Sequence, residues 1–196
     1  MAEAILSQLD AVNQMLLTIG EQSVNSLDSS GVLEVEIAKT TLAEVSRTVQ
    51  GEDWSFNVEH NITLTPEIDG YITLPNNCTK VWQEPRTRPA VIQRGRKLYN
   101  LTDHTALFTK PVRVSMRYFL GFEDLIPAAT HYITLRASRR FQERVTGSQV
   151  TEEFLIREEL AARAVLVADD ATISGLNMLK DNRPIFETVR RDRWTN

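Results

Sequence analysis

Residues 42–64, LAEVSRTVQGEDWSFNVEHNITL, contain a change of hydrophobic period that decides the fold. Before Gly51 the apolar residues repeat at spacings of three and four, which is the pattern of an amphipathic helix: Leu42, Val45 and Val49. After Gly51 they alternate with polar residues, which is the pattern of a strand: Trp54, Phe56 and Val58. The chain is therefore expected to pass from helical to β structure at Gly51.

Helical patterns lie on both sides of this β region. Residues 3–19 and 35–49 carry stripes at spacings of three and four, and Gly20 and Gly51 follow them as stop signals, so two antiparallel helices are expected. A third helix is predicted from Pro127, a residue suited to a first turn, to a stop at Gly147. Thr151 is expected to cap a fourth helix, whose broad apolar face predicts burial on more than one side.

The central region has turn signals at the spacing expected between antiparallel strands. A turn at residues 66–70 follows the first strand, and Gly95 separates two short apolar pairs in the manner of a hairpin. The last strand has the clearest alternation, since every second residue from Val112 to Tyr118 is apolar or aromatic. One face of this strand is expected to be buried, and the other to be solvated or bound.

The expected fold class is thus α+β: a helical bundle built from both chain ends, with an inserted antiparallel β module. Residues 1–51 and 124–196 are assigned to the discontinuous helical domain, and residues 52–123 to the inserted β domain. A length of 196 residues is enough for one good core or for two small cores that share a boundary.

Composition limits the classes of function. The net charge of −4 gives no overall attraction to nucleic acid or to an anionic membrane. Cys78 is the single cysteine, so neither an internal disulfide framework nor a thiolate zinc site is expected, and a reducing compartment fits. The sequence shows no apolar run of membrane-spanning length and no signal peptide pattern at its start, so no membrane insertion is expected. We expect no cofactor and no metal.

No motif assembles a catalytic set, and a non-enzymatic protein is therefore predicted. The sequence contains no nucleophile elbow, phosphate-binding glycine loop or zinc-protease helix motif. Adjacent carboxylates such as Glu123 and Asp124 raise the alternative of a polysaccharide-degrading enzyme. Glycosidases, however, need two carboxyl groups that face each other across a sugar, and neighbouring residues point in different directions.

Arginine outnumbers lysine by 17 to 5, and Arg side chains are favoured at protein interfaces. The candidate interface or channel-facing residues lie in the third helix and the last strand: Arg136, Arg139, Arg140, Arg144, Arg113 and Arg117. Three readings stay open: a solvated face with intrahelical ion pairs, contact with an acidic partner, or a surface toward DNA. Free binding to duplex DNA through the 136–144 face is a further alternative.

The C-terminal segment mixes apolar and basic residues without a clean period. We interpret it as partly extended and docked either on its own subunit or on a neighbour, because aromatic and Arg anchors carry much of the energy of interfaces. The candidate docking residues are Phe186, Val189, Arg190 and Trp194.

Four separated motifs give the chain a family resemblance. They are residues 11–28 (AVNQMLLTIGEQSVNSLD), residues 52–74 (EDWSFNVEHNITLTPEIDGYITL), residues 132–147 (YITLRASRRFQERVTG) and the N-M-L element at 177–179. With these motifs the sequence resembles the tail tubular protein A family of T7-like podoviruses, the head-to-tail adaptor or gatekeeper proteins. The similarity is weakest at residues 78–116 and after Lys180.

The resemblance implies a structural virion protein with a mechanical role. The expected assembly is a dodecameric ring that joins the portal protein to a nozzle of the tubular protein B type, with tail fibres docked near their junction. Genomic DNA would pass through its channel during ejection. The helical part is expected to form the ring and meet the portal, and the β module to project toward nozzle and fibres. The protein would be made in the host cytoplasm and carried in the virion tail.

Overall fold

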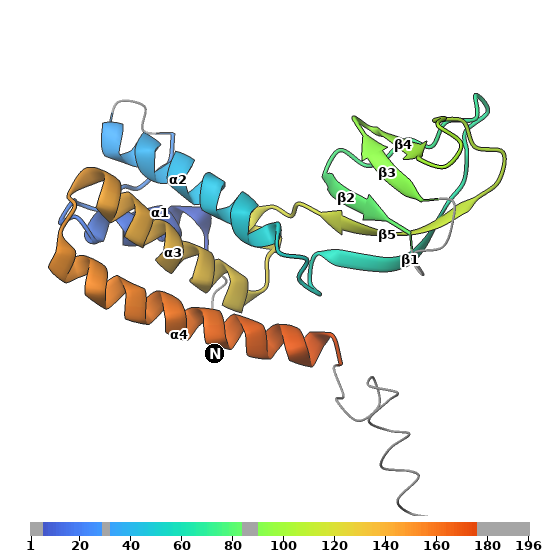
Figure 1. The fold of residues 1–196 in the computed structure, drawn as a ribbon. Coiled ribbons are helices and arrows are strands. Elements are labelled where there is room, and N and C mark those ends of the chain that lie inside the picture. Colours follow the sequence, from blue (N-terminus) through green and yellow to red (C-terminus); the bar gives the residue numbers. More distant parts are fainter. Residues whose placement is uncertain (1–5, 29–31, 84–89, 176–196) are drawn as a thin grey trace, which may run out of the picture.

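The computed structural model describes residues 6–28, 32–83 and 90–175. Helices gather at one end of the molecule and strands at the other, and two stretches of chain cross between them (Figure 1). The helices are α1 (Gln8–Leu17), α2 (Leu33–Gln50), α3 (Pro127–Val145) and α4 (Gln149–Ile173). Helices from both chain ends pack together and an antiparallel sheet is inserted between them, so the predicted α+β fold class is confirmed.

The first two helices match their apolar stripes. Ser7 caps α1 in a reciprocal capping box, in which the backbone N–H of Asp10 donates to its hydroxyl over 3.1 Å. Gly20 has a φ of +82°, and beside it the N–H of Glu21 donates to Leu16 O, which closes the helix as the sequence indicated. In α2 the whole predicted stripe is buried: Val35, Ala38, Leu42, Val45 and Val49.

The last two helices form a hairpin around Gly147. Pro127 occupies the first turn of α3, as predicted. The N-cap of α4 is Ser148, whose hydroxyl accepts from the N–H of Thr151, so the expectation that Thr151 caps this helix is wrong. Both residues have the hydroxyl that a cap needs, and the turn at Gly147, with a φ of +63°, lets the helix begin earlier.

The helical core is centred on α3. Its fully buried residues include Tyr132, Ile133, Ala137 and Phe141, which pack against the buried stripes of the other three helices. The prediction of a broad buried face on α4 is wrong for the isolated subunit, because only Leu155, Ala162 and Leu166 of this helix are buried.

The β part contains a three-stranded antiparallel sheet and a hairpin. The sheet order is β1 (Val58–Leu64), β5 (Val112–Tyr118), β2 (Cys78–Trp82), so the last strand lies in the centre. The hairpin of β3 (Val91–Arg94) and β4 (Lys97–Asn100) turns at Gly95, as expected. A second core lies between sheet and hairpin; its most buried residues include Ile72, Leu74, Leu98, Val114 and Met116.

The strand prediction is wrong for Trp54 and Phe56. These residues precede β1, and Trp54 belongs to the helical core, where its indole N–H donates to Val49 O over 2.8 Å. The ring of Phe56 stacks on that of Trp54 at 6.3 Å between centroids. Their alternation has the period of a strand, but the chain here makes a turn that returns both rings to the helices.

The face of β5 that carries its polar residues is less exposed to solvent than the sequence pattern predicts. Ser115 is fully buried, and its hydroxyl lies 3.1 Å from Nδ1 of His60 on the neighbouring strand β1. A bulge in β1 between Glu59 and Ile62, with Asn61 at a φ of +61°, lies next to this pair. The outward face of the sheet is therefore partly covered by its own side chains.

Ile133→Ala should lower the free energy of unfolding by about 2–5 kcal/mol, because it leaves a cavity in the helical core where Ile133 is fully buried. Urea unfolding followed by circular dichroism measures this change. Ile68→Ala, at a fully exposed loop position, is the matched control and should stay within about 0.5 kcal/mol of the parent. Equal losses in both variants would contradict the position of the core.

Candidate functional site

The junction between the helical and β parts is the first candidate site. The chain leaves the helices after α2 and returns to them before α3, and Gln50 ties the two crossings together. Its Oε1 accepts from the N–H of Leu120 over 2.8 Å, and its Nε2 donates to Leu120 O over 3.1 Å. Gln50 is buried, so this reciprocal pair is shielded from competing water.

Asn57 extends the same connection to the beginning of β1. Its side-chain amide donates to Gln50 O over 2.8 Å, and its own carbonyl accepts from the N–H of Tyr118 at the end of β5. Asn57 is buried. The last turn of α2, the start of β1 and the end of β5 are therefore joined through the side chain and the carbonyl of Asn57.

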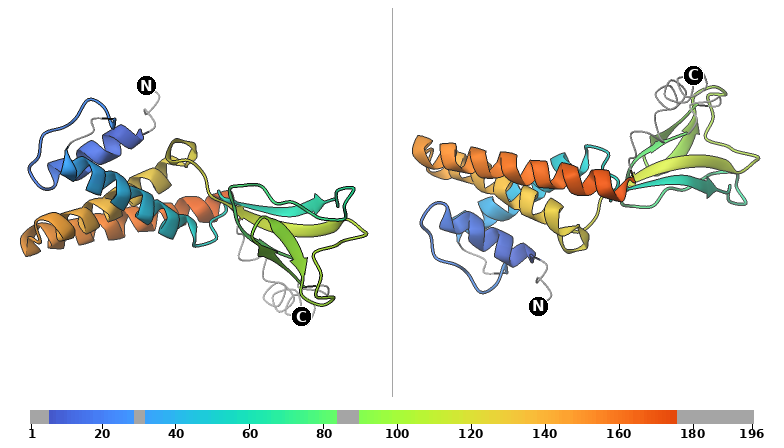
Figure 2. Two further views of the ribbon diagram at one scale, coloured as in Figure 1. Left: turned by 90° about the horizontal axis from the view of Figure 1, so that it is seen from above. Right: turned by 90° about the horizontal axis from the view of Figure 1, so that it is seen from below.

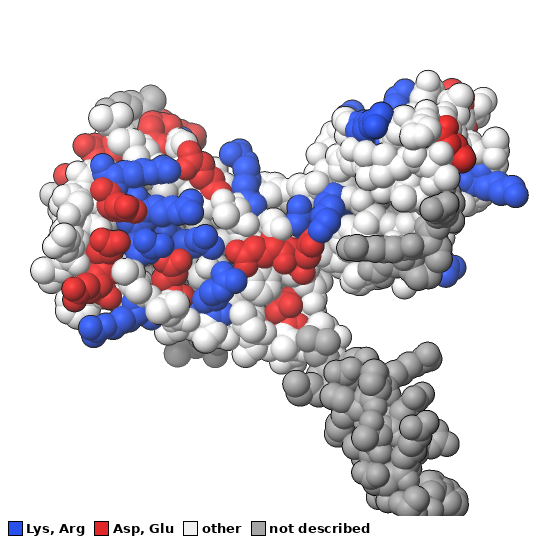
Figure 3. Space-filling model, viewed as in Figure 1, with Lys and Arg blue, Asp and Glu red and all other residues white. Residues whose placement is uncertain are grey.

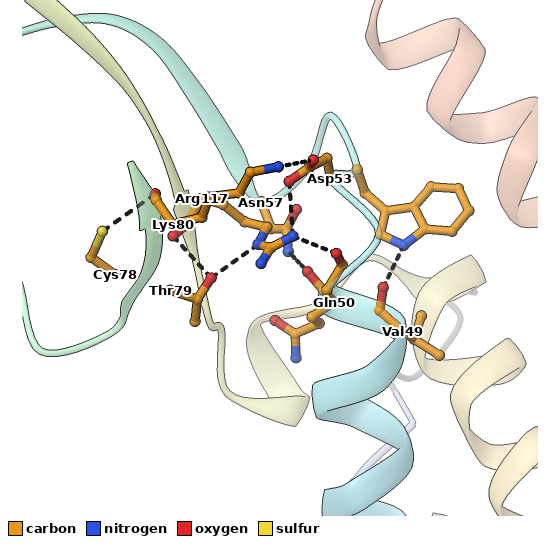
Figure 4. Close-up of polar contacts among 10 residues, drawn as sticks. Val49, Gln50, Asp53, Asn57, Cys78, Thr79, Lys80 and Arg117 are labelled. Atoms are coloured by element: carbon orange, nitrogen blue, oxygen red, sulfur yellow. Dashed lines mark hydrogen bonds and ion pairs between the residues drawn. The ribbon is translucent and has the colours of Figure 1, made fainter. Parts of the chain in front are cut away.

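A charged cluster lies at the outer side of the junction (Figure 4). The carboxylate of Asp53 pairs with Arg117 over 2.8 Å and with Lys80 over 2.5 Å, and these partners come from strands β5 and β2. Arg117 also donates to Gly51 O and to Thr79 Oγ1. Asp53 has a φ of +58°, so its backbone adopts a conformation that costs energy for a residue with a side chain.

This cluster orients the sheet relative to the helices. Arg117 is only 14% exposed, and it bridges the end of α2 to two strands at once. Beside it lies a pocket of about 260 Å³ with mostly apolar walls, lined in part by Arg47, Gln50 and Phe119. The arrangement supplies ion pairs and hydrogen bonds between the end of α2 and strands β2 and β5.

Two acid groups near the junction have raised pKa values. Burial, together with the charge of Glu59, raises the pKa of Tyr118 to about 12. Burial also raises the pKa of the Cys78 thiol. A thiol that is held protonated is a poor nucleophile and a poor metal ligand, so Cys78 acts as a small core residue.

The second candidate site is the arginine face of α3, where the structure brings α4 and the junction together. Arg139 Nε donates to Glu159 over 2.5 Å, and Arg136 donates to the hydroxyl of Tyr132 over 2.9 Å. Arg163 of α4 donates to the same hydroxyl and to Glu52. These hydrogen bonds raise the pKa of Arg139 and of Arg163. Basic and acidic groups interleave over this end of the molecule (Figure 3).

The remaining α3 arginines differ from each other. Arg144 reaches α2, where it donates to Thr41 Oγ1 and pairs with Glu44 over 2.8 Å. This pair lowers the pKa of Glu44. Arg140 makes no ion pair with any residue in the described part of the chain. Arg140 is thus the member of the stripe whose charge is available to a partner.

The other predicted residues are separated from this face. Arg113 and Arg117 lie on β5 in the other half of the molecule; Arg117 holds the junction, whereas Arg113 is exposed and, among described residues, forms no ion pair. The tail candidates Phe186, Val189, Arg190 and Trp194 lie outside the described residues.

Three further observations concern chemistry. Glu123 and Asp124 lie side by side on one short 3-10 helix, η1 (Phe122–Asp124). Within residues 6–28, 32–83 and 90–175, no group of three or more His, Cys, Asp or Glu residues could hold a metal ion. In the same ranges, no helix combines the length and apolar character that crossing a bilayer requires.

Sequence reasoning missed the residues that build both sites. Gln50, Asp53 and Asn57 look like ordinary polar residues near a helix end, and Glu52 and Glu159 look like solvated carboxylates. A local signal exists only for Asp53, because Gly51-Glu52-Asp53 follows a helix and such a turn admits a left-handed residue. The partners of the arginines lie up to 111 residues away, so no local pattern could pair them.

Asp53→Asn should loosen the junction while keeping a side chain that tolerates a positive φ. It removes the charge that faces Arg117 and Lys80, and the expected loss is about 1 kcal/mol of unfolding free energy because the cluster is partly exposed. Small-angle scattering should also show a broader distribution of shapes. Asp169→Asn, at an exposed position on α4, is the control. An unchanged scattering profile for Asp53→Asn would remove the cluster from its orienting role.

The raised pKa of Tyr118 predicts that the protein loses stability in alkali. Its pKa is about 12 in the folded protein and about 10 in an unfolded chain, so the folded state holds the phenol proton more tightly. This contribution is complete below pH 10 and disappears as the pH rises through 12. Denaturant unfolding between these pH values should show a shallower decline for Tyr118→Phe than for the parent. Identical declines would contradict the shifted pKa.

Comparison with known proteins agrees with these features. A family model described as tail tubular protein matches residues 9–176, which include every helix and strand of the structure except the first residue of α1. Tail tubular protein A of Klebsiella phage KP34 is 29% identical over 128 residues, which cover 65% of this chain and 67% of that relative. The chain therefore belongs to the tail tubular protein family, the structural proteins of the bacteriophage virion tail.

Proposed function

We propose that this protein is the ring-forming adaptor that connects the portal to the tail nozzle of a short-tailed phage. In this role it forms part of the DNA ejection channel and of the region where tail fibres attach. The observation that carries the proposal is the family match over residues 9–176, because it spans the helical part, the junction and the β part together. An adaptor needs two different ends, and the chain has a helical end and a β end.

The shape of the subunit supports this role. The helical and β parts lie at opposite ends of an elongated molecule, and the views from above and below show the same separation (Figure 2). We assign the helical part, residues 1–51 and 124–196, to the ring and the portal contact. The β part, residues 52–123, is assigned to the nozzle and fibres. The junction then carries load between the two contacts through Gln50 and Arg117.

Copies of one chain close into a ring when two different side surfaces fit each other head to tail. We propose a ring of twelve copies, as the family resemblance implies. The tail candidates Phe186, Val189, Arg190 and Trp194 are assigned to docking on the same subunit or on the next one in this ring.

Among the candidate arginines, Arg140 and Arg113 are the best suited to meet a partner or passing DNA. Arg117, Arg136, Arg139 and Arg144 already pair with carboxylates of the same subunit, and their charge is largely compensated. A channel with few uncompensated cations suits DNA that has to move through it, because each phosphate contact adds affinity.

Purified protein mixed with the portal of the same phage should form a ring-on-ring complex, which negative-stain or cryogenic electron microscopy would show. Portal alone and adaptor alone are the controls. The map should place the helical part against the portal and the β part away from it. Absence of any complex across a range of salt concentrations would refute the adaptor role, and a β part against the portal would reverse the proposed polarity.

A further inference from the structure

Helix α4 is much less buried than its many apolar residues would predict. It has 25 residues, of which only Leu155, Ala162 and Leu166 are buried within the subunit. Several of its large apolar side chains are exposed instead: Val150, Phe154, Ile156, Leu160, Val165, Val167 and Ile173. They are half of the exposed large hydrophobic residues in the described ranges. In the view from below, α4 lies in front of the other helices (Figure 2).

Five of these residues, together with three exposed alanines, form two stripes, one on each side of the buried stripe. Residues of an α-helix advance by about 100° each, so positions three and four apart share a face. Relative to the buried stripe, the first flank carries Phe154, Ala161, Val165 and Ala168, and the second flank carries Ile156, Leu160, Ala164 and Val167. A surface helix that packs on one side only is expected to be polar on the other two, and α4 is not.

Charge is also depleted along the centre of α4. Within residues 160–168, LAARAVLVA, Arg163 is the one charged residue. Its guanidinium is directed back to the subunit, where it donates to Tyr132 and to Glu52 over 3.0 and 2.9 Å. Depletion of charged residues marks the centre of protein interfaces rather than a solvated surface.

The two flanks differ in shape. On the first flank, α3 and α4 enclose a largely apolar groove of about 340 Å³, lined by His131, Leu135, Glu158, Ala161, Ala162 and Val165. On the second flank the large side chains of Ile156, Leu160 and Val167 stand out from the helix, with Leu160 63% exposed. A groove on one side and a ridge on the other can repeat indefinitely between identical subunits.

We propose that α4 is the helix through which neighbouring copies of this chain pack, the ridge at Leu160 of one copy seated in the α3/α4 groove at Val165 of the next. The proposal rests on the ring assembly proposed above and names the surface that closes it. Such a contact is heterologous, because each subunit uses both flanks and each flank meets the other kind. A symmetric pair, or a segment of the same chain, would cover one flank and leave the second exposed.

Cysteine crosslinking in assembled tails tests the pairing. Leu160→Cys and Val165→Cys are made singly and together, and the tails are treated with a flexible bis-maleimide before denaturing electrophoresis. The double variant should give a ladder of crosslinked multimers, and each single variant should stay monomeric. The parent, whose single Cys78 is buried, is the control and should also stay monomeric.

Each other outcome has a defined meaning. A crosslinked dimer from either single variant would show a symmetric contact and overturn the head-to-tail proposal. Monomer from the double variant, in tails where microscopy shows the ring, would overturn the role of α4 and leave the adaptor function standing. Absence of both ring and ladder would reject both proposals.

Charge variants provide an independent test. Leu160→Asp and Val165→Asp should each remain folded by circular dichroism, because both side chains are more than half exposed, and each should lose ring assembly on the portal. Ile68→Asp is the matched control on the β part and should assemble. A mixture of the two α4 variants retains one intact groove and one intact ridge, so mass photometry should detect dimers but no rings. Normal rings from either single variant would contradict the proposal.

Discussion

The rest of the structure depends on the requirement that the inserted β part leave the helical part and return to it at one place. The buried amide of Gln50 meets this requirement with two hydrogen bonds to the backbone of Leu120, so the outgoing and returning crossings are held side by side. Because a buried amide has no water to replace its partners, loss of the bond from Leu120 N–H would leave Oε1 of Gln50 unsatisfied. The end of α2 and the beginning of α3 are consequently fixed relative to each other, and the helical core can form from segments that are distant in the sequence.

The sequence predicts what local periodicity controls and fails where partners are distant. The stripe of α2 and the hairpin at Gly95 were predicted correctly, because both follow from spacing and from turn chemistry. The alternation around Trp54 predicts a strand, yet its indole packs in the helical core and donates a hydrogen bond to Val49 O. Asp53 has a left-handed backbone, and its carboxylate pairs with residues of two strands, a contact that exists only after the chain has folded.

The arginine stripe of α3 shows that distant partners also limit what the sequence predicts about function. Its spacing indicated a basic face, and the structure supplies carboxylates to Arg136, Arg139 and Arg144 from elements that the stripe itself does not contain. A single exposed ion pair of this kind contributes little to stability. Here, however, Arg136 and Arg139 both pair with Glu159, and Arg136 and Arg163 both donate to the hydroxyl of Tyr132, so the contacts connect α3 with α4. Five of the eleven arginines in the described ranges thus form ion pairs within the subunit, and the apolar flanks of α4 are the more informative surface.

The single point of insertion also has an evolutionary meaning. Since the two crossings are hydrogen-bonded at Gln50 and Leu120, and Trp54 and Asn57 attach the outgoing chain to α2, the helical part is held together before the strands begin. The strands that follow, from Val58 to Tyr118, have a core of their own. A β part from a relative can therefore replace this one without altering the helical core, as long as Trp54, Asn57 and Leu120 are kept.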